Sequence, residues 1–240
     1  MKAVILAGGK GTRLKPYTTI FPKPLVPLGN RPILDIIIKQ LIYYGFHDIT
    51  LTVGYLAELI QAYFSNIKNE FKEIKINYVR EKKPTGTAGS IGMISGLNET
   101  FLVMNGDILT SLDYSKLISY HFEKKSILTI AMYKKKVKID LGVIEIDQNN
   151  ILTGYIEKPE NIYPVSMGIY VYEPDVLKYI EPNKYLDFPT LVLRLLENGE
   201  KIVGYPCDDF WMDIGRQEDY ALAQEKFEIM KDKFLHGANV

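Results

Sequence analysis

The sequence predicts an α/β fold whose parallel strands are covered by helices on both faces of the sheet. Through the first half of the chain, short apolar runs alternate with segments of helical periodicity. Parallel strands joined by crossover helices produce this β-α-β-α rhythm. The composition fits a globular protein, because 47% of the 240 residues are hydrophobic and 24% are charged.

The elements of the first half follow from apolar runs and from helical faces. The run at Val4–Ala7 predicts a buried strand, and Ile74, Ile76 and Tyr78 alternate as a strand requires. A helical face is formed by Leu34, Ile37, Ile38, Leu41 and Ile42. We expect strands at Lys2–Ala7, Ile49–Val53, Ile74–Val79 and Phe101–Asn105, with helices at Arg31–Tyr44, Leu56–Ile67 and Thr87–Leu97.

From Ile127 onward, strands follow one another with short polar connections, which predicts a mixed, partly antiparallel extension. The expected strands are Ile127–Tyr133, Gly142–Asp147, Leu152–Glu157 and Val165–Tyr172, and the expected helices are Asp187–Glu197 and Arg216–Lys233. The lysine run at 134–138 is typical of a solvated loop, with a contact to a phosphate group as the alternative. Because no linker or repeat interrupts the chain, we expect one domain with two lobes.

Charge and cysteine content exclude several classes of protein. Basic and acidic residues are equal at 29 each, so no long-range field favours nucleic acid or an anionic membrane. One cysteine, Cys207, excludes an intrachain disulfide framework, and no neighbouring histidine favours it as a nucleophile. His47, His121 and His236 lack metal-ligand spacing. With neither a signal peptide nor a long apolar stretch, we expect a cytoplasmic protein.

A glycine-rich loop directly follows the first strand and predicts a phosphate-binding site. Leu6 and Ala7 lead into Gly8, Gly9 and Gly11, then Thr12 and Arg13. Glycines let backbone N–H groups approach a phosphate, and Arg13 with Lys23 of Pro22-Lys23-Pro24 adds positive charge. A glycine loop alone is also typical of a tight turn. Neither the P-loop pattern nor the dinucleotide fingerprint is met, since Gly11 follows Lys10 and Leu14 stands where a glycine is required.

Two acidic motifs stand far apart in the chain. Asn105-Gly106-Asp107 ends a strand, and Asp213 is followed by Ile214-Gly215. Alone, each aspartate fits a turn or a helix N-cap. Together at one crevice they would suit Mg²⁺, which binds few carboxylates and completes its shell with phosphates. Two loops complete the set of motifs: Glu81 to Gly89, with Pro84 and Gly86 at a turn before helical N–H groups, and Glu157-Lys158-Pro159, otherwise an exposed ion pair.

These motifs, in this order from Met1 to about Glu228, resemble the sugar-phosphate nucleotidyltransferases. The closest match in motif is to mannose-1-phosphate guanylyltransferase-like members. The resemblance implies a Rossmann-like α/β/α sandwich with a mixed central sheet and a small β-rich sugar-binding extension. It also implies one domain over 1–240, with a nucleotide half at about 1–125 and a sugar-phosphate half at about 126–240.

The resemblance assigns roles to residues of this sequence. Arg13 and Lys23 would be catalytic, and Mg²⁺ would bind Asp107 and Asp213. Nucleotide binding would fall to Leu6, Ala7, Gly8, Gly9, Gly11, Thr12, Arg13, Glu81, Pro84, Gly86 and Thr87. The sugar phosphate would contact Asn105, Gly142, Glu157, Lys158 and Ser166. Ser166 departs from the family pattern, because many relatives carry Asn there.

The implied reaction transfers a nucleoside monophosphate from a nucleoside triphosphate to a sugar 1-phosphate. Glu81 favours GTP, because a carboxylate accepts hydrogen bonds from the N1 and N2 donors of guanine. The alternatives are UTP, dTTP or CTP, a catalytically silent nucleotide-sugar sensor, or a solvent-facing Glu81 paired with Lys82 or Lys83. The failed fingerprint disfavours a nicotinamide-dependent oxidoreductase. We expect a stand-alone catalytic module, because little chain follows Asp213, and a homodimer is compatible with it.

Overall fold

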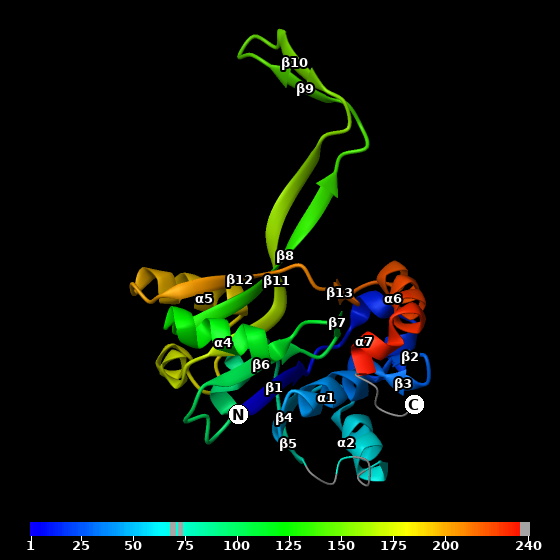
Figure 1. Cartoon of the computed structure of the whole chain (residues 1–240), viewed down its shortest axis with the longest axis vertical. Coiled ribbons are helices and arrows are strands. Elements are labelled where there is room, and N and C mark those ends of the chain that lie inside the picture. Colours follow the sequence, from blue (N-terminus) through cyan, green and yellow to red (C-terminus); the bar gives the residue numbers. More distant parts are fainter. Residues whose placement is uncertain (68–70, 72–73, 236–240) are drawn as a thin grey trace.

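A mixed seven-stranded sheet forms the centre of the protein (Figure 1). The computed structural model describes residues 1–67, 71 and 74–235. The strand order is β12-β8-β11-β6-β1-β4-β5. Their bounds are β1 Lys2–Ala7, β4 Asp48–Val53, β5 Lys75–Arg80, β6 Phe101–Asn105, β8 Leu128–Lys138, β11 Glu160–Tyr172 and β12 Ile202–Cys207. Strands β5, β4, β1 and β6 are parallel, and β11 runs antiparallel to both β6 and β8. The predicted mixed α/β sheet is confirmed.

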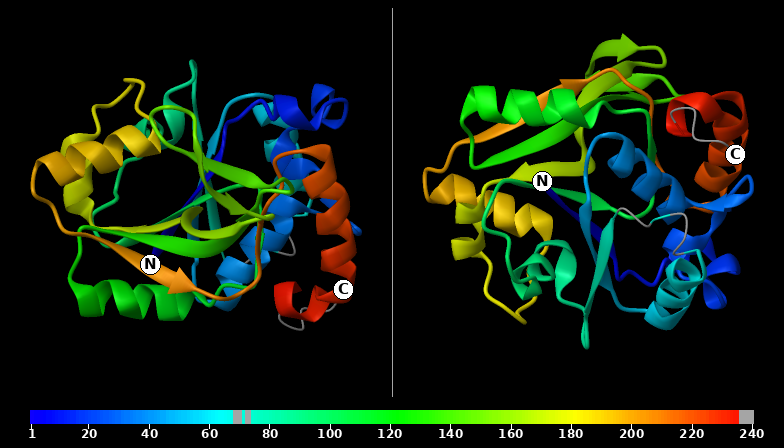
Figure 2. Two further views of the ribbon diagram at one scale, coloured as in Figure 1. Left: turned by 90° about the horizontal axis from the view of Figure 1, so that it is seen from above. Right: turned by 60° about the horizontal axis from the view of Figure 1, so that its bottom comes forward.

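Helices cover both faces of this sheet (Figure 2). They are α1 Ile33–Tyr43, α2 Ala57–Asn66, α3 Gly86–Gly89, α4 Tyr114–Lys124, α5 Phe188–Glu197, α6 Gln217–Ile229 and α7 Lys231–Leu235. Neighbouring residues of a strand face opposite sides, so Ile5 joins a core with α1, α2, α4, α6 and α7, while Val4 joins another with α3 and α5. No helix in the described ranges is long and apolar enough to cross a membrane.

Three small two-stranded sheets complete the fold. They pair β2 Pro27–Leu28 with β3 Arg31–Pro32, β7 Ile108–Thr110 with β13 Trp211–Asp213, and β9 Val143–Ile146 with β10 Leu152–Ile156. The β9/β10 hairpin stands away from the body, at the end of a ribbon formed by the extended halves of β8 and β11 (Figure 1).

Two expected helices are wrong as single elements. The segment Thr87–Leu97 forms only α3 and a 3₁₀ turn at Ile91–Met93. A Cβ at Gly89 would lie 2.5 Å from the carbonyl oxygen of Lys184, so this close approach leaves room only for glycine. The expected helix Arg216–Lys233 is divided at Met230 into α6 and α7.

The lysine run at 134–138 is strand rather than loop, because β8 pairs with β11 as far as Lys138 opposite Glu160. An ion pair of 3.1 Å between Lys136 and Glu160 accompanies this pairing. Sequence reasoning missed α4 and β12. The helix carried a readable signal, since Asp113 caps it by accepting hydrogen bonds from the N–H groups of Ser115 and Lys116.

Candidate active site

A cavity of about 800 Å³ opens beyond the carboxyl ends of β1, β4, β5 and β6. This is where ligands bind in open α/β sheets. Ten of the residues predicted to bind nucleotide, to act in catalysis or to bind metal line this cavity: Leu6, Ala7, Gly8, Gly9, Lys23, Glu81, Pro84, Gly86, Thr87 and Asp107. Asn105, predicted for the sugar phosphate, also lines it. Three motifs distant in sequence thus share one cavity.

Close backbone contacts explain why this loop is rich in glycine. A Cβ at Gly8 would lie 2.4 Å from the Oε1 atom of Glu81. Gly11 has a φ of 59°, and its Cβ would lie 2.9 Å from the Cβ of Lys23. Thr12 and Arg13 follow in a 3₁₀ turn, Thr12–Leu14. The glycines therefore bring Glu81 and Lys23 against the loop.

The two acidic motifs meet. The backbone N–H of Ile214 donates a 3.0 Å hydrogen bond to the carbonyl oxygen of Asp107. In the ladder between β7 and β13, Asp213 stands opposite Ile108. The two aspartates are therefore held side by side by main-chain pairing.

Two cations accompany these acids. The Nζ atom of Lys23 forms an ion pair with the carboxylate of Asp107, and Lys23 is only 7% exposed. A Cβ at Gly215 would lie 3.1 Å from the Oδ2 atom of Asp213 and 3.5 Å from the guanidinium of Arg13. Burial raises the pKa of Asp213, and the Asp107 carboxylate raises it further, while Lys23 and Arg13 oppose the shift. Four charged side chains thus converge.

The donor set at these acids fits a divalent cation. The Oδ1 atom of Asp107 is buried and has no hydrogen-bond partner within the described part of the chain. A buried carboxylate oxygen left without a partner is costly. Over the same residues, no cluster of three or more His, Cys, Asp or Glu forms a complete metal site. Two carboxylates that leave room for phosphate oxygens match the coordination preferred by Mg²⁺.

The loop after β5 holds Glu81 in place. Its Oε2 atom accepts hydrogen bonds from the backbone N–H of Thr85 at 3.0 Å and from the Thr85 hydroxyl at 2.8 Å. The loop turns at Gly86, whose φ is 79° and whose Cβ would lie 2.4 Å from the carbonyl oxygen of Leu186. Glu81 is therefore fixed at the wall of the cavity.

Two of the N–H groups in the short helix α3 are bonded within the protein. The N–H groups of Ala88 and Gly89 both donate to the carbonyl oxygen of Leu186, at 3.0 and 2.9 Å. The hydroxyl of Thr87 accepts from the N–H of Phe188 at 2.9 Å. The later N–H groups of this short helix are thus tied to the residues before α5, whereas Gly86 and Thr87, which open it, line the cavity.

The predicted sugar-phosphate residues are divided between two places. Asn105 lines the cavity. Ser166 lies nearby: its hydroxyl accepts a hydrogen bond from the N–H of Gly168, and a Cβ added at Gly168 would lie 2.6 Å from the Asn105 amide. Gly142, Glu157 and Lys158 belong instead to the hairpin end of the ribbon, where Glu157 and Lys158 are exposed. The structure does not bring these three to the cavity of their own chain.

Sequence reasoning missed several cations of the cavity wall. Lys10, Arg80, Lys82 and Lys83 line the cavity, and three of them stood inside motifs already identified. Cys207 does not line the cavity, and burial raises the pKa of its thiol to about 12, so the thiol stays protonated at neutral pH. His121 is buried between Thr129 and Glu173, and His236 lies outside the described residues.

Proteins of known function are similar to this chain in sequence. A UTP–glucose-1-phosphate uridylyltransferase of Synechocystis sp. is 33% identical over 92% of this chain and 61% of its own. The mannose-1-phosphate guanylyltransferase catalytic subunit beta of Drosophila melanogaster is 31% identical over 91% of this chain and 60% of its own. The chain therefore spans about three fifths of the length of these curated relatives.

Solved structures share the fold. HddC from Yersinia pseudotuberculosis superposes with a TM-score of 0.72 at 29% identity, over 94% of this chain and 99% of HddC. HddC has also been crystallised in complex with GMP-PN. Residues 2–229 match the family described as nucleotidyl transferase. This chain belongs to the nucleotidyl transferase family.

Proposed function

We propose that this protein transfers a nucleoside monophosphate, with GTP as the favoured donor, to a sugar 1-phosphate. The observation that carries the proposal is the convergence of Asp107, Asp213, Lys23 and Arg13 beside a nucleotide-sized cavity. Two acids suited to a divalent cation, together with two cations, are what transfer at a polyphosphate requires. The curated relatives, which this chain matches over about three fifths of their length, support the same class of reaction.

The chemistry needs no covalent nucleophile from the protein. An oxygen of the sugar 1-phosphate attacks the α-phosphorus, and the bond from that phosphorus to the bridging oxygen breaks. Pyrophosphate leaves with the bonding electron pair. The protein positions both phosphates and stabilises the developing charge.

The residues have distinct roles in this proposal. Arg13 and the N–H groups of the glycine loop hold the triphosphate, and Lys23 stabilises charge at the α-phosphate. Asp107 and Asp213 would hold Mg²⁺, which supplies positive charge against the reacting phosphate oxygens. Asn105 and Ser166 contact the acceptor at the cavity, and Gly142, Glu157 and Lys158 complete the contact when the end of the β8/β11 ribbon reaches a cavity.

Glu81 is the residue we propose for selection of the base. Its carboxylate lines the cavity and is bonded by Thr85, and no described ion pair joins it to Lys82 or Lys83. A fixed carboxylate accepts hydrogen bonds from guanine but repels the carbonyl oxygens of uracil and thymine. The similarity to both guanylyl- and uridylyl-transferring relatives makes this choice an experimental question.

A panel of GTP, UTP, dTTP and CTP against several sugar 1-phosphates, followed by coupled pyrophosphate release, tests the proposal. We expect release only when both substrates are present, and kcat/KM for GTP to exceed that for UTP by roughly tenfold to a hundredfold. Equal values for GTP and UTP would overturn the base assignment. No turnover with any pair, combined with tight binding of a nucleotide sugar, would favour the silent sensor.

A further inference from the structure

A long arm projects from the body of the protein and has no part in lining the cavity. The arm comprises residues 134–165, with a stem of paired β8 and β11 at 134–138 and 160–165 and a tip at 139–159 that contains β9 and β10. It extends from the body with no other element beside it (Figure 1). A two-stranded hairpin with nothing packed on it is only marginally stable in water, so a partner surface would stabilise the arm.

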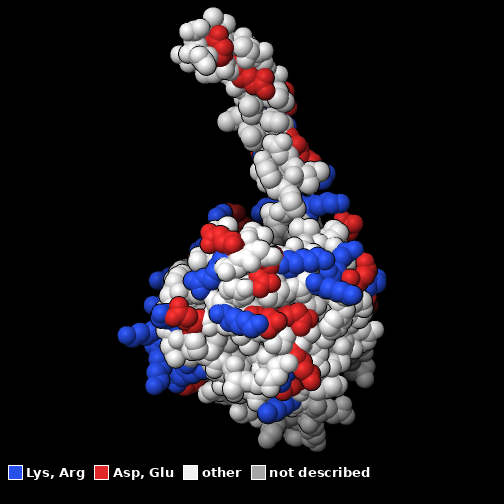
Figure 3. Space-filling model, turned by 90° about the vertical axis from the view of Figure 1, so that its left-hand side faces the viewer, with Lys and Arg blue, Asp and Glu red and all other residues white. Residues whose placement is uncertain are grey.

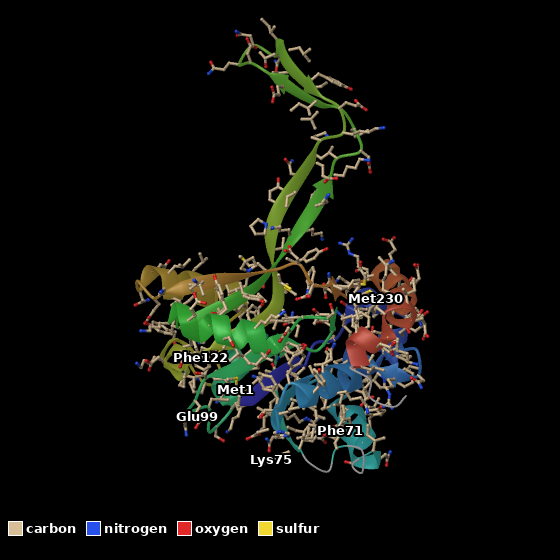
Figure 4. The ribbon with its side chains drawn as sticks, in the orientation of Figure 1. Met1, Phe71, Lys75, Glu99, Phe122 and Met230 are labelled. Atoms are coloured by element: carbon tan, nitrogen blue, oxygen red, sulfur yellow. The ribbon has the colours of Figure 1, made fainter. Side chains whose placement is uncertain are left out.

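The arm exposes many large apolar side chains to solvent. About half of the large apolar side chains that are exposed in the described residues belong to it. Leu141 is 74% exposed, Ile151 62% and Leu152 60%. Side chains project from both faces of the arm with none from the body against them (Figure 4). A concentration of exposed apolar residues of this kind marks a protein interface.

The root of the arm lies at the site, whereas its tip does not. Ser166 follows the arm directly and lies next to Gly168, which approaches Asn105 at the cavity. Lys158, in the tip, pairs only loosely with Glu157 at 3.9 Å, and both are exposed. The residues that the acceptor side requires are therefore carried away from the cavity of their own chain.

We propose that two copies of this chain exchange arms, and that Glu157 and Lys158 of each arm complete the acceptor side of the other copy's site. The Lys158 ammonium then meets the sugar phosphate, and the apolar face of the tip is buried against the second copy. The assignment to the acceptor rests on the proposed function.

The charge of the arm fits a second copy better than another partner. The stem carries Lys134, Lys135, Lys136 and Lys138 against the single Glu160, which pairs with Lys136, and the tip carries Asp140, Glu145, Asp147 and Glu157 against the single Lys158. Acidic side chains are visible toward the tip and basic ones where the arm joins the body (Figure 3). In a twofold dimer the two arms cross in opposite directions, so the basic stem of each lies along the acidic tip of the other.

The stem ladder also opposes closure of the arm onto its own cavity. Backbone pairs join β8 and β11 continuously from Ser166 opposite Met132 to Glu160 opposite Lys138. At about 3.3 Å per residue, these seven positions hold the tip roughly 20 Å from the root. Lys158 would reach its own Asp107 only if this ladder bent sharply or broke.

Sedimentation equilibrium tests the exchange without any assay of activity. We expect the wild-type chain to be a dimer, and Ile144→Ser with Leu152→Ser in the tip to weaken dimerisation by at least about a hundredfold. The matched control is Leu193→Ser with Leu196→Ser, two equally exposed leucines of α5, which should leave the dimer intact. A monomeric wild-type protein, or a dimer that the tip variant does not weaken, would overturn the proposal.

Complementation tests whether the arm acts in the other copy. Lys158→Ala loses the tip contact and Asp213→Asn loses the metal site, so each variant alone should be nearly inactive at low sugar phosphate. After mixing and exchange of subunits, half of the dimers are mixed and each has one complete site. Activity should then rise to about a quarter of the wild-type value.

No gain on mixing, from variants that do exchange subunits, would show that each arm serves its own cavity and would overturn the exchange of site residues. If the wild-type protein turns over no substrate pair, the proposed function has failed. The sedimentation result then still decides whether the copies exchange arms.

Discussion

The pairing of Lys23 with Asp107 predicts a stability defect that a divalent cation corrects. Lys23→Met removes the positive charge and keeps an apolar chain of similar length. The side chain of Lys23 is 9% exposed and that of Asp107 is 24% exposed. Lys23 pairs with the Oδ2 atom of Asp107, and the Oδ1 atom has no hydrogen-bond partner in the described ranges. The variant therefore leaves a largely buried carboxylate without its counter-charge.

The expected loss in the free energy of unfolding of Lys23→Met lies between two known limits. Removal of one partner from a fully buried ion pair costs about 3–5 kcal/mol, and exposed pairs contribute about 0.2–1 kcal/mol. Because water still reaches part of Asp107, we expect a loss of about 2 kcal/mol in EDTA. For a chain of this size that loss lowers the Tm by roughly 4–8 °C.

Differential scanning calorimetry in EDTA and in MgCl₂ measures the effect. Magnesium should raise the Tm of Lys23→Met more than that of the wild type, because the cation supplies the missing charge. Addition of Asp107→Asn to the variant should recover part of the loss, because no unpaired charge remains. Lys10→Met, an exposed lysine of the same cavity, is the control and should change stability by less than about 0.5 kcal/mol. A drop of less than about 1 °C for Lys23→Met would refute the reasoning.

Three further predictions concern turnover. Asp107→Asn and Asp213→Asn should each lower kcat roughly a hundredfold, about 3 kcal/mol of transition-state stabilisation, in a pyrophosphate-release assay with Mg²⁺; near-normal turnover of a folded variant would remove that residue from the metal site. Lys158→Ala should mainly raise the KM for the sugar phosphate, whereas Lys23→Ala should mainly lower kcat, and an unchanged KM in Lys158→Ala would place the acceptor contact elsewhere. Glu81→Gln should reduce the preference for GTP over UTP measured as a ratio of kcat/KM, and an unaltered ratio would show that another group reads the base.

The parallel strands of the first half of the chain could be predicted, because each is marked by a local pattern of apolar residues. The strands β1, β4 and β6 are mostly apolar runs, as a parallel sheet buried on both faces requires, and the edge strand β5 is an alternating run. The family resemblance also implied that Asp107 and Asp213 meet, and the structure places Asp107 in the turn between β6 and β7 and Asp213 at the end of β13. Hydrogen bonding between Ile214 and Asp107 supplies the contact that the motifs implied.

The arm could not be predicted, because its strands are defined by long-range pairing. Lys138 opposes Glu160 across the whole β9/β10 hairpin, and four lysines in five positions carry no alternating pattern. The same limit applies to Lys158: its motif indicated a role, but no local pattern shows that the residue lies in the tip of the arm, away from the cavity of its own chain. The break in the expected helix at 87–97 does have a local signal, because Gly89, Gly92 and Gly96 each oppose helix formation.

The fate of labelled oxygen tests the central claim most directly. A sugar 1-phosphate labelled with ¹⁸O in its phosphate group is incubated with the wild-type protein, GTP and Mg²⁺, and the products are analysed by mass spectrometry. Attack of the sugar phosphate on the α-phosphorus predicts that all label remains in the nucleotide sugar and that the pyrophosphate carries none. Label in the pyrophosphate, or pyrophosphate formed without a nucleotide sugar, would contradict the account.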